Sequence, residues 1–267
     1  MITRPQFTSI LEEGYRTGAP FGAKGAILRE YLQCEVLTIL TQIPGSQQLA
    51  FIGGTGLRLL YNLDRFSEDL DFDYFGRPPS APLEMFQQTA KTLGQRGYAV
   101  DFRVKPSKTD RGGKLVFQHV LFEIGLSPHK NETLVIKLDY TTPVTEEPTE
   151  SRVLNRFGFV VQVLTEPLPT LCSRKAAAFL NRKRTQPRDL YDLAWFFSRR
   201  VYPDTATFHR FAPQEAGDPI VEIIDKLKKI PTDVMRQYQR DLEPLLLNSA
   251  NASTIQSLLP MAQQAHF

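Results

Sequence analysis

The 267-residue sequence predicts an α+β fold, with a mixed sheet in its first two-thirds and a helical bundle after it. Three observations carry this prediction. Strand-like segments gather between residues 49 and 165, a long helical pattern precedes them, and only helical periodicity follows Pro167. Segregated strands and helices are typical of the α+β class rather than of alternating α/β folds. We place the boundary near Glu166–Pro169, which gives predicted domains at 1–166 and 167–267.

The elements follow in order along the chain. Helical spacing of apolar residues predicts a helix over about 23–42, and LAFIG (49–53) predicts a short buried strand running into a glycine turn. EDLDFDY (68–74) alternates strictly, which predicts a second strand, and a helix over about 82–95 comes next. Further strands are predicted at YAVDFRVK, KLVFQHVLFE, TLVIKLDY and FGFVVQVL, a charged loop at TTPVTEEPTESR, and helices at LCSRKAAAFLNR, RDLYDLAWFFSRR and three weaker stretches.

The overall composition excludes several classes of protein. The chain is 42% hydrophobic and 23% charged, which excludes a disordered chain, a collagen-like fibre and a coiled-coil rod. Two cysteines, Cys34 and Cys172, cannot build a disulfide framework or a four-thiolate zinc site. No run approaches 18 apolar residues, and the first residues lack a signal-peptide core. We therefore expect a cytoplasmic protein without a membrane partner.

The net charge of +3 is unevenly distributed along the sequence. Residues 1–74 hold six Lys and Arg against nine Asp and Glu, a net charge of −3, whereas residues 171–240 hold 14 against eight, a net charge of +6. An acidic front suits a cation and a basic back suits a polyanion. Chance segregation of solvated charges is the alternative.

The acidic strand carries the first candidate site. Residues two apart in a strand face the same side, so Asp69, Asp71 and Asp73 share one face. Carboxylates spaced by about 6–7 Å repel one another unless water screens them or a cation lies between them. Mg²⁺ takes one or two carboxylates together with substrate phosphates. We therefore predict Asp69 and Asp71 as metal ligands, the alternative being a solvated acidic edge; Tyr74 and Ser80 exclude an EF-hand because they stand where it needs Gly and Glu.

A glycine turn lies shortly before this strand. Gly53, Gly54 and Thr55 occupy a strand-to-helix junction, where glycines allow close backbone approach and the helix N-terminus favours an anion. The hydroxyl of Thr55 adds a further donor, so we predict a phosphate cradle. The segment is neither a Walker A loop nor a dinucleotide fingerprint. Without the acidic strand, an ordinary tight turn would be the better interpretation.

A third segment places charge on a strand that is otherwise apolar. In TLVIKLDY, Lys137 and Asp139 share a face with Val135. Such charges are costly unless they are paired or functional. Asp139 could supply a third carboxylate to a metal pair or act as the general base that activates an attacking hydroxyl. A Lys–Asp pair on a solvent-facing strand is the alternative.

The helical part of the chain adds a basic segment. A Lys point charge such as Lys175 suits a triphosphate, and Asp192 could orient that lysine or a substrate hydroxyl. A basic cluster could hold a polyanion through phosphate contacts, and the candidates for this role, which becomes RNA binding under the resemblance given below, are Arg182, Lys183 and Arg184. The alternative for these three residues is a solvated hairpin surface, with an Arg188–Asp192 pair beside it.

Together the four segments resemble the AbiEii/MenA-type nucleotidyltransferase toxins, a branch of the polymerase-beta-like nucleotidyltransferases. The resemblance rests on GGTGLRLLY…RFSEDLDFD, IKLDY, SRKAAAFL and PRDLYDL, in that order, and spans residues 51–193. It implies a polymerase-beta-like core with the helical bundle after it. Two small departures are Gly56, where the family usually has Ala or Ser, and Thr55, where Ser is commoner in the superfamily.

The resemblance also implies roles for individual residues. Asp69 and Asp71 match the metal-binding DxD, Gly54 and Thr55 match the phosphate-contacting pair, and the strand with Lys137 and Asp139 matches the KxD motif. Lys175 and Asp192 match the later lysine and aspartate motifs. On this basis the expected catalytic residues are Asp69, Asp71, Asp139, Lys175 and Asp192; the nucleotide-binding residues are Gly53, Gly54, Thr55, Lys137 and Lys175; and the metal ligands are Asp69, Asp71 and Asp139.

The expected function is a Mg²⁺-dependent (or Mn²⁺-dependent) toxin of a toxin–antitoxin or abortive-infection system. It would transfer a nucleoside monophosphate from an NTP to an RNA 3′ end, with tRNA as the favoured acceptor and a cognate antitoxin as partner. Two alternatives stay open: a nucleotide-binding regulator without transfer activity, and an enzyme that nucleotidylates a protein hydroxyl. The intact carboxylates argue against the regulator, because a pure binder does not need such a costly cluster.

Overall fold

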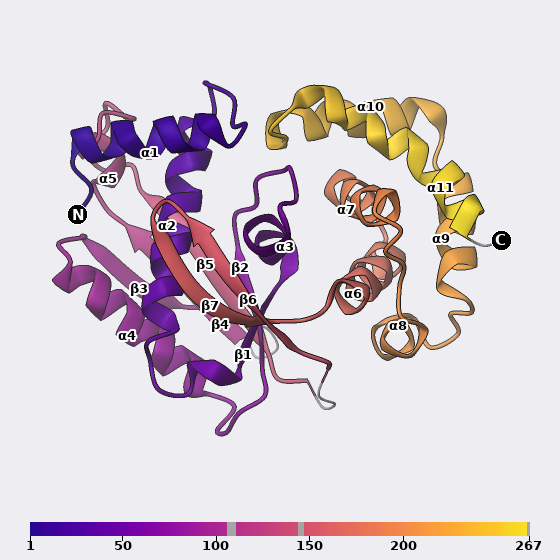
Figure 1. The fold of residues 1–267 in the computed structure, drawn as a ribbon, viewed down its shortest axis with the longest axis horizontal. Helices are drawn as coiled ribbons and strands as arrows, with labels where there is room; N and C mark the ends of the chain where they lie inside the picture. The colour runs from indigo at the N-terminus through magenta and orange to yellow at the C-terminus, as the bar shows by residue number, and fades with distance from the viewer. Residues whose placement is uncertain (106–110, 144–146, 266–267) are drawn as a thin grey trace. The chain divides into compact units, whose positions relative to one another are not determined.

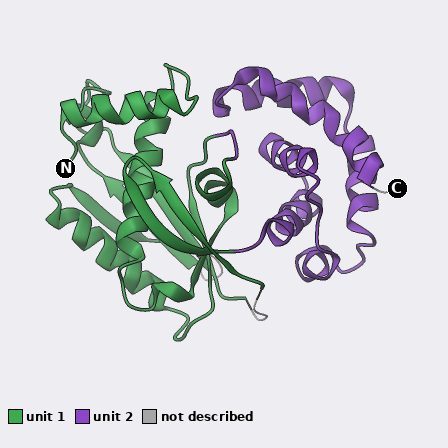
Figure 2. Ribbon diagram, viewed as in Figure 1, with its two compact units in different colours: residues 1–62, 66–165 green, residues 63–65, 166–267 purple. Residues whose placement is uncertain are grey.

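The computed structural model describes residues 1–105, 111–143 and 147–265. The chain divides into two compact units, drawn in different colours in Figure 2. The first comprises residues 1–62 and 66–165, and the second comprises residues 63–65 and 166–267. The division falls beside the boundary expected from the sequence. The assignment of residues 63–65 to the second unit was not expected, and a buried ion pair of Arg65 accounts for part of it.

The first unit is built on a mixed sheet, which confirms the predicted α+β class. In the described residues its order is β1-β2-β5-β4-β3 (Figure 1). Strands β2 and β5 run parallel, whereas the other neighbouring pairs are antiparallel. The strands are β1 (Leu49–Ile52), β2 (Leu70–Tyr74), β3 (Val100–Val104), β4 (Arg111–Phe117) and β5 (Leu134–Thr141).

Two helices cover one face of this sheet. Phe86 of α4 (Ala81–Gln95) packs its ring against Phe72 of β2, Phe102 of β3 and Tyr140 of β5. Helix α2 (Lys24–Leu40) packs on the same layer and is buried along most of its length. The residues that alternate with these aromatic side chains face the other way, and that second face carries the candidate site.

Three parts of the first unit differ from the sequence-based expectation. Helix α1 (Arg4–Arg16) was not expected, although Thr3 and Gln6 form a capping box at its start. The segment KLVFQHVLFE is a strand only to Phe117, because His119 adopts a left-handed conformation (φ 63°) and the short helix α5 (Val120–Glu123) follows.

The third difference is a β-hairpin. The sequence predicted a charged loop over the whole of TTPVTEEPTESR, but the last three residues of this segment begin a strand. Strand β6 (Glu150–Arg156) pairs antiparallel with β7 (Phe159–Thr165), the predicted strand FGFVVQVL. Residues 144–146 of the expected loop lie outside the described residues.

The second unit is helical, as predicted. Its two main helices are α6 (Leu168–Asn181) and α7 (Pro187–Ser198). The ammonium group of Lys226 donates hydrogen bonds to the carbonyls of Phe179, Leu180 and Arg182, which satisfies the C-terminal end of α6. The remaining helices are α8 (Thr205–Phe211), α9 (Pro219–Lys228), α10 (Thr232–Leu242) and α11 (Leu258–Ala265). Across the described part of the chain, no helix has both the length and the apolar character that crossing a membrane requires.

Candidate functional site

The sheet register brings the predicted carboxylates together. Asp71 of β2 lies directly opposite Asp139 of β5, and Asp69 precedes β2 by one residue. Neighbouring strands are about 4.8 Å apart, so these acidic groups share one small area of the sheet. Asp73 behaves differently: it is fully buried, and the hydroxyl of Thr141 donates a hydrogen bond to its carboxylate. The acidic alternation therefore contains one structural aspartate as well as the half-buried pair Asp69 and Asp71.

Two glycines give the carboxylates their space. Gly53 has a φ of 75°, and a Cβ atom there would lie 2.2 Å from Asp71 Oδ2. Gly112 of β4 lies opposite Asp139 in the register, and a Cβ atom there would lie 2.7 Å from Asp139 Oδ1. Both contacts are far below van der Waals distance, so glycine is required at both positions. At Gly112 the carbonyl oxygen of Leu138, 2.2 Å from the Cβ position, adds to the requirement. The sequence predicted Gly53 as part of a phosphate cradle, which stays a prediction, and its packing against Asp71 was not expected. Gly112 carried no recognisable signal in the sequence.

The backbone before Asp69 is fixed by buried side chains. Gln33 of α2, only 1% exposed, donates hydrogen bonds to the carbonyls of Ser67 (3.1 Å) and Glu68 (2.9 Å). The hydroxyl of Thr55, also buried, donates to the carbonyl of Asp69 at 2.5 Å. Three consecutive carbonyls are therefore held although the segment belongs to no strand. Thr55 acts here as an anchor for Asp69, and a direct phosphate contact from its hydroxyl stays a prediction.

Lysine side chains neutralise two of the three carboxylates. Lys137 Nζ lies 3.3 Å from Asp69 Oδ1, and Lys105 Nζ lies 3.6 Å from Asp139 Oδ1. Within the described residues, that Asp139 oxygen is buried without a hydrogen-bond partner. Burial raises the pKa of Asp139, Lys105 acts against this, and the negative charge of Asp69 adds to the increase. A carboxyl with a raised pKa suits a proton acceptor, which is the base role expected for Asp139.

The donor set suits a divalent cation. Among the described residues, no group of three or more His, Cys, Asp or Glu side chains is arranged as a metal site. The set of Asp69, Asp71 and Asp139 is therefore not assembled around one position, and its role as a three-ligand set stays a prediction. Mg²⁺ needs only one or two carboxylates when substrate phosphates supply other oxygens. The neighbouring Asp69 and Asp71, with the orphaned Asp139 oxygen beside them, meet that requirement.

In the second unit, Asp192 of α7 is fully buried between two cations. Arg65 holds it with two hydrogen bonds, Nε to Oδ1 at 2.6 Å and Nη2 to Oδ2 at 2.8 Å, and Lys175 Nζ lies 2.8 Å from Oδ2. Burial would raise the pKa of Asp192, but Arg65 and Lys175 outweigh it and hold the pKa at about 2. Asp192 thus contacts Lys175 as the sequence suggested, and the considered pairing with Arg188 is not formed. Arg65 was missed, although it lies within the quoted RFSEDLDFD segment.

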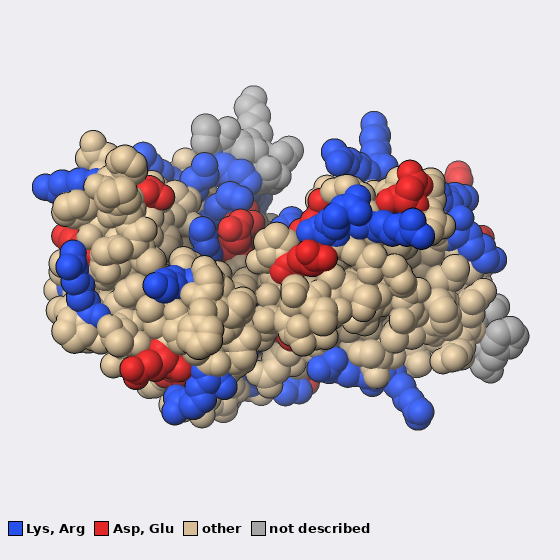
Figure 3. Space-filling model, turned by 90° about the horizontal axis from the view of Figure 1, so that it is seen from above, with Lys and Arg blue, Asp and Glu red and all other residues tan. Residues whose placement is uncertain are grey.

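The basic cluster of the second unit is only partly available to a ligand. Arg182 is the C-terminal cap of α6, and its Nε lies 3.2 Å from the buried Asp189 carboxylate. Lys183 and Arg184 are exposed, whereas Arg174 is paired with Glu166. On the face shown in Figure 3, Lys and Arg side chains form several small groups, some of them beside acidic side chains. The RNA-contacting role of Arg182, Lys183 and Arg184 stays a prediction.

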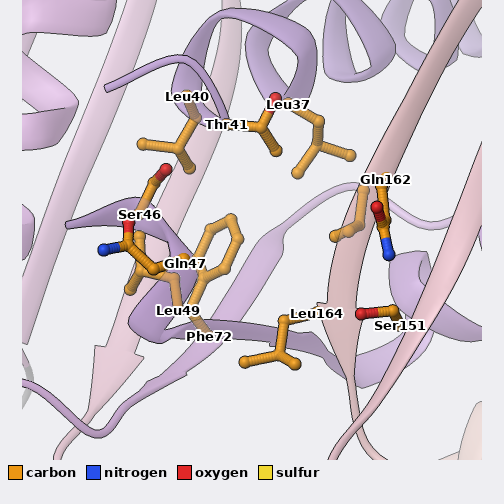
Figure 4. A pocket seen from close by; sticks show the side chains of 11 residues that line it. Leu37, Leu40, Thr41, Ser46, Gln47, Leu49, Phe72, Ser151, Gln162 and Leu164 are labelled. Atoms are coloured by element: carbon orange, nitrogen blue, oxygen red, sulfur yellow. The ribbon is translucent and has the colours of Figure 1, made fainter. Parts of the chain in front are cut away.

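A cavity of about 330 Å³ lies on the helix-covered side of the first unit (Figure 4). Phe72 belongs to its lining and points away from the face that carries Asp71. Among the described residues that line the cavity none is charged, so it does not suit a triphosphate. Its lining consists of Leu37, Leu40, Thr41, Ser46, Gln47, Leu49, Phe72, Ser151, Gln162, Val163 and Leu164.

Known structures share the fold of this chain. The Helicobacter pylori protein JHP933 is 21% identical, with a TM-score of 0.57, and the match covers 91% of this chain and 92% of that chain. A structure described as a putative nucleotidyltransferase from H. pylori is 22% identical, with a TM-score of 0.57 and coverages of 91% and 95%. MenT4, a nucleotidyltransferase toxin of Mycobacterium tuberculosis H37Rv, is 18% identical, with a TM-score of 0.60 and coverages of 98% and 90%. A search of curated proteins found no match.

A family model decides the identity. The model described as "Nucleotidyl transferase AbiEii toxin, Type IV TA system" matches residues 35–259, most of the chain, including the glycine turn, all three carboxylates, Lys175 and Asp192. This confirms the resemblance inferred from the sequence motifs. Membership implies an NTP substrate and an antitoxin partner, and the family generally uses a divalent metal. The chain belongs to the AbiEii nucleotidyltransferase toxin family of type IV toxin–antitoxin systems.

Proposed function

We propose that this nucleotidyltransferase transfers a nucleoside monophosphate from an NTP to the 3′ end of an RNA, with a tRNA acceptor end as the favoured substrate. The observation that carries the proposal is the packing of Gly53 against the Asp71 carboxylate, where a Cβ atom would fall 2.2 Å from Oδ2. The turn that we assign to phosphate therefore adjoins the carboxylate that we assign to the metal, and nucleotidyl transfer requires such an arrangement. The choice of tRNA follows the family resemblance.

The proposed reaction is an in-line displacement at the α-phosphorus of the NTP. The 3′ oxygen of the RNA forms the new P–O bond, the bond from the α-phosphorus to the bridging oxygen breaks, and pyrophosphate leaves with the electron pair. Asp139 accepts the proton of the 3′-hydroxyl. The backbone at Gly53 and Gly54 binds the triphosphate, and we assign Lys137 to the same ligand. The nucleotide-binding role of Lys175 stays a prediction from the sequence.

The carboxylates of Asp69 and Asp71 would hold the divalent cation, Mg²⁺ or Mn²⁺. When bound, it would neutralise negative charge on the triphosphate and on the leaving pyrophosphate. Gln33 and Thr55 support this function indirectly, because they fix the backbone that presents Asp69. Asp192 supports it in the second unit, because it directs the ammonium group of Lys175.

The test is incubation of the protein with each labelled NTP, Mg²⁺ and total RNA, followed by separation on a gel. We expect label in an RNA band with the wild type, and none with Asp69→Asn or Asp71→Asn, whose folding is checked by circular dichroism. Label in a protein band that resists ribonuclease would favour the alternative of protein nucleotidylation. Tight NTP binding without any labelled product would favour the regulator and overturn the proposal.

A further inference from the structure

The register of the sheet places three basic side chains in one row. Arg103 of β3 pairs with Lys114 of β4, and Lys114 pairs with Lys137 of β5. Residues directly opposite each other on neighbouring strands point to the same face. This face also bears Asp139, two residues from Lys137. Helix α4 packs on the opposite face, through Phe86 against Phe102 and Tyr140. All three basic side chains are exposed.

Repulsion between the three neighbouring positive charges of this row destabilises the free protein. Like charges directly opposite each other destabilise a sheet. Lys137 is partly neutralised by Asp69 at 3.3 Å, and Arg103 has a solvent-exposed pairing with Asp101 at 3.6 Å. For Lys114, between them, the described part of the structure gives no hydrogen bond or ion pair. A central cation without an acidic partner, flanked by two cations, is what a polyanion-binding face requires.

The row of Arg103, Lys114 and Lys137 and the glycine turn lie on opposite sides of the carboxylates. The sheet order is β1-β2-β5-β4-β3, so the carboxylates of β2 and β5 lie between two regions. The glycine turn follows β1 on one side, and the row extends over β5, β4 and β3 on the other. It covers two strand spacings, about 10 Å, and ends at Lys137, which contacts Asp69.

We infer that Arg103 and Lys114 bind the backbone of the acceptor RNA and that the row leads its 3′ end to the carboxylates. The inference rests on the proposed function and deepens it, because it names where the second substrate lies. A triphosphate is less suited to these two residues, since the glycine turn lies beyond β2 at the opposite side of the carboxylates. Lys137, at the junction of the row and the carboxylates, is left to the nucleotide.

The experiment compares the double variant Arg103→Gln/Lys114→Gln with wild type. The control is Lys91→Gln, which removes one exposed positive charge from α4, the helix on the opposite face. Three quantities are measured: the Kd for labelled tRNA at several salt concentrations, the Kd for NTP, and the melting temperature at low salt without RNA. Binding of tRNA is measured without NTP, so the result does not depend on transfer activity.

We expect the double variant to bind tRNA about tenfold more weakly at low salt, with a salt slope reduced by about two phosphate contacts. NTP affinity should not change. Relief of like-charge repulsion should raise the melting temperature by about 1–2 °C. The Lys91→Gln control should leave tRNA affinity and slope at the wild-type values.

Several results would overturn the inference. If wild type and double variant have equal tRNA affinity and parallel salt slopes, Arg103 and Lys114 do not bind RNA and the inference is wrong. The proposed function would still stand if the wild type extends RNA. Weaker NTP binding in the double variant would assign the row to the triphosphate instead. If the wild type bound tRNA normally but extended no RNA, the proposed function would fail and the binding data would still decide the inference.

Discussion

At the scale of single residues, the site depends on glycines that leave room for carboxylates. Gly53 and Gly112 both have positive φ angles, and both would place a Cβ atom against an acidic side chain. The backbone that presents Asp69 is also fixed. Gln33 and Thr55 donate hydrogen bonds to the carbonyls of Ser67, Glu68 and Asp69. The carboxylates are therefore positioned by contacts within the protein, whether or not the same residues also bind a substrate.

Replacing Gly53 with alanine tests this positioning. The new methyl group displaces Asp71, and a displacement of about 1 Å lowers kcat by about 100-fold. Gly158 provides a matched control because it has the same φ of 75° and nothing within 4 Å of its Cβ position. Gly158→Ala should therefore lose about 1 kcal/mol of unfolding free energy and keep its kcat. Equal loss of kcat in both variants would mean that backbone strain, not displacement of Asp71, causes the effect.

The pH dependence of transfer tests the assignment of Asp139. Burial raises its pKa and Lys105 opposes that increase, so removal of Lys105 raises the pKa further. A base must be deprotonated to accept a proton, so activity falls as pH drops through this pKa. In Lys105→Met, the acid limb of the pH–rate profile should move to higher pH, by about one unit or less. Lys91→Met serves as the control, and an acid limb that stays in place would remove Asp139 from the base role.

At the scale of elements, a short segment between α3 (Gly53–Tyr61) and β2 belongs to the helical unit. Residues 63–65 join it through a bridge between Arg65 and Leu246, through the amide of Leu247 on the carbonyl of Asp64, and through the buried pair of Arg65 with Asp192. A buried carboxylate with two cationic partners is costly to disrupt, because removal of one partner leaves charge uncompensated. The segment is thus held by charge as well as by backbone hydrogen bonds.

Arg65→Met should lower the unfolding free energy at pH 7 by about 3 kcal/mol, since Lys175 still pairs with Asp192. The folded-state pKa of Asp192, about 2, lies below its value of about 3.9 in the unfolded chain. The stabilisation is therefore complete above pH ~4 and disappears as pH falls towards 2. Urea unfolding at several pH values should show that the difference in unfolding free energy between variant and wild type shrinks as pH falls from 4 towards 2. The control is Arg188→Gln, at an exposed position of α7, the helix that carries Asp192. It should change the unfolding free energy by about 0.5 kcal/mol or less. An equal effect of both variants would reject the buried ion pair as the cause.

Local sequence patterns predicted the strands and the side-chain pairs that depend only on neighbouring residues. Strict alternation identified β2 and β5, and spacing by two placed Asp69 with Asp71 and Lys137 with Asp139. Strand β6 was missed because its segment is charged and follows a Pro-containing stretch, and it becomes a strand only by pairing with β7.

Residues that act across long distances in the chain gave no such signal. Gln33 reaches carbonyls 34 and 35 residues away, and Arg65 reaches Asp192 across 127 residues. Gly112 is recognisable only from the β4–β5 register, which sets it opposite Asp139. Their roles depend on tertiary contacts, so no local periodicity marks them.

At the scale of the whole molecule, pairing reduces the number of free cations in the basic part of the sequence. Of the basic residues in 171–240, Arg174, Lys175 and Arg182 are engaged with Glu166, Asp192 and Asp189. The 14 Lys and Arg residues of this segment therefore overstate how many cations are free to meet a polyanion, whereas the net charge of +6 already counts Asp189 and Asp192. Within the predicted cluster, the side chains best able to reach phosphates are Lys183 and Arg184, with Arg182 as a weaker third.

The triple variant Arg182→Ala/Lys183→Ala/Arg184→Ala measures what this cluster contributes. For every phosphate that the wild-type cluster neutralises, the variant's slope of log affinity against log salt should be shallower by about 0.7–0.9. Because Arg182 already neutralises the buried Asp189, we expect a change equivalent to about two phosphates rather than three, with NTP affinity unchanged. The measurement is tRNA affinity against salt, compared with the conservative variant Lys183→Arg, which keeps the charge and should keep the slope. A slope equal to that of the wild type would show that the cluster is a solvated surface. A change equivalent to a full three phosphates would show that Arg182 leaves Asp189 to bind RNA.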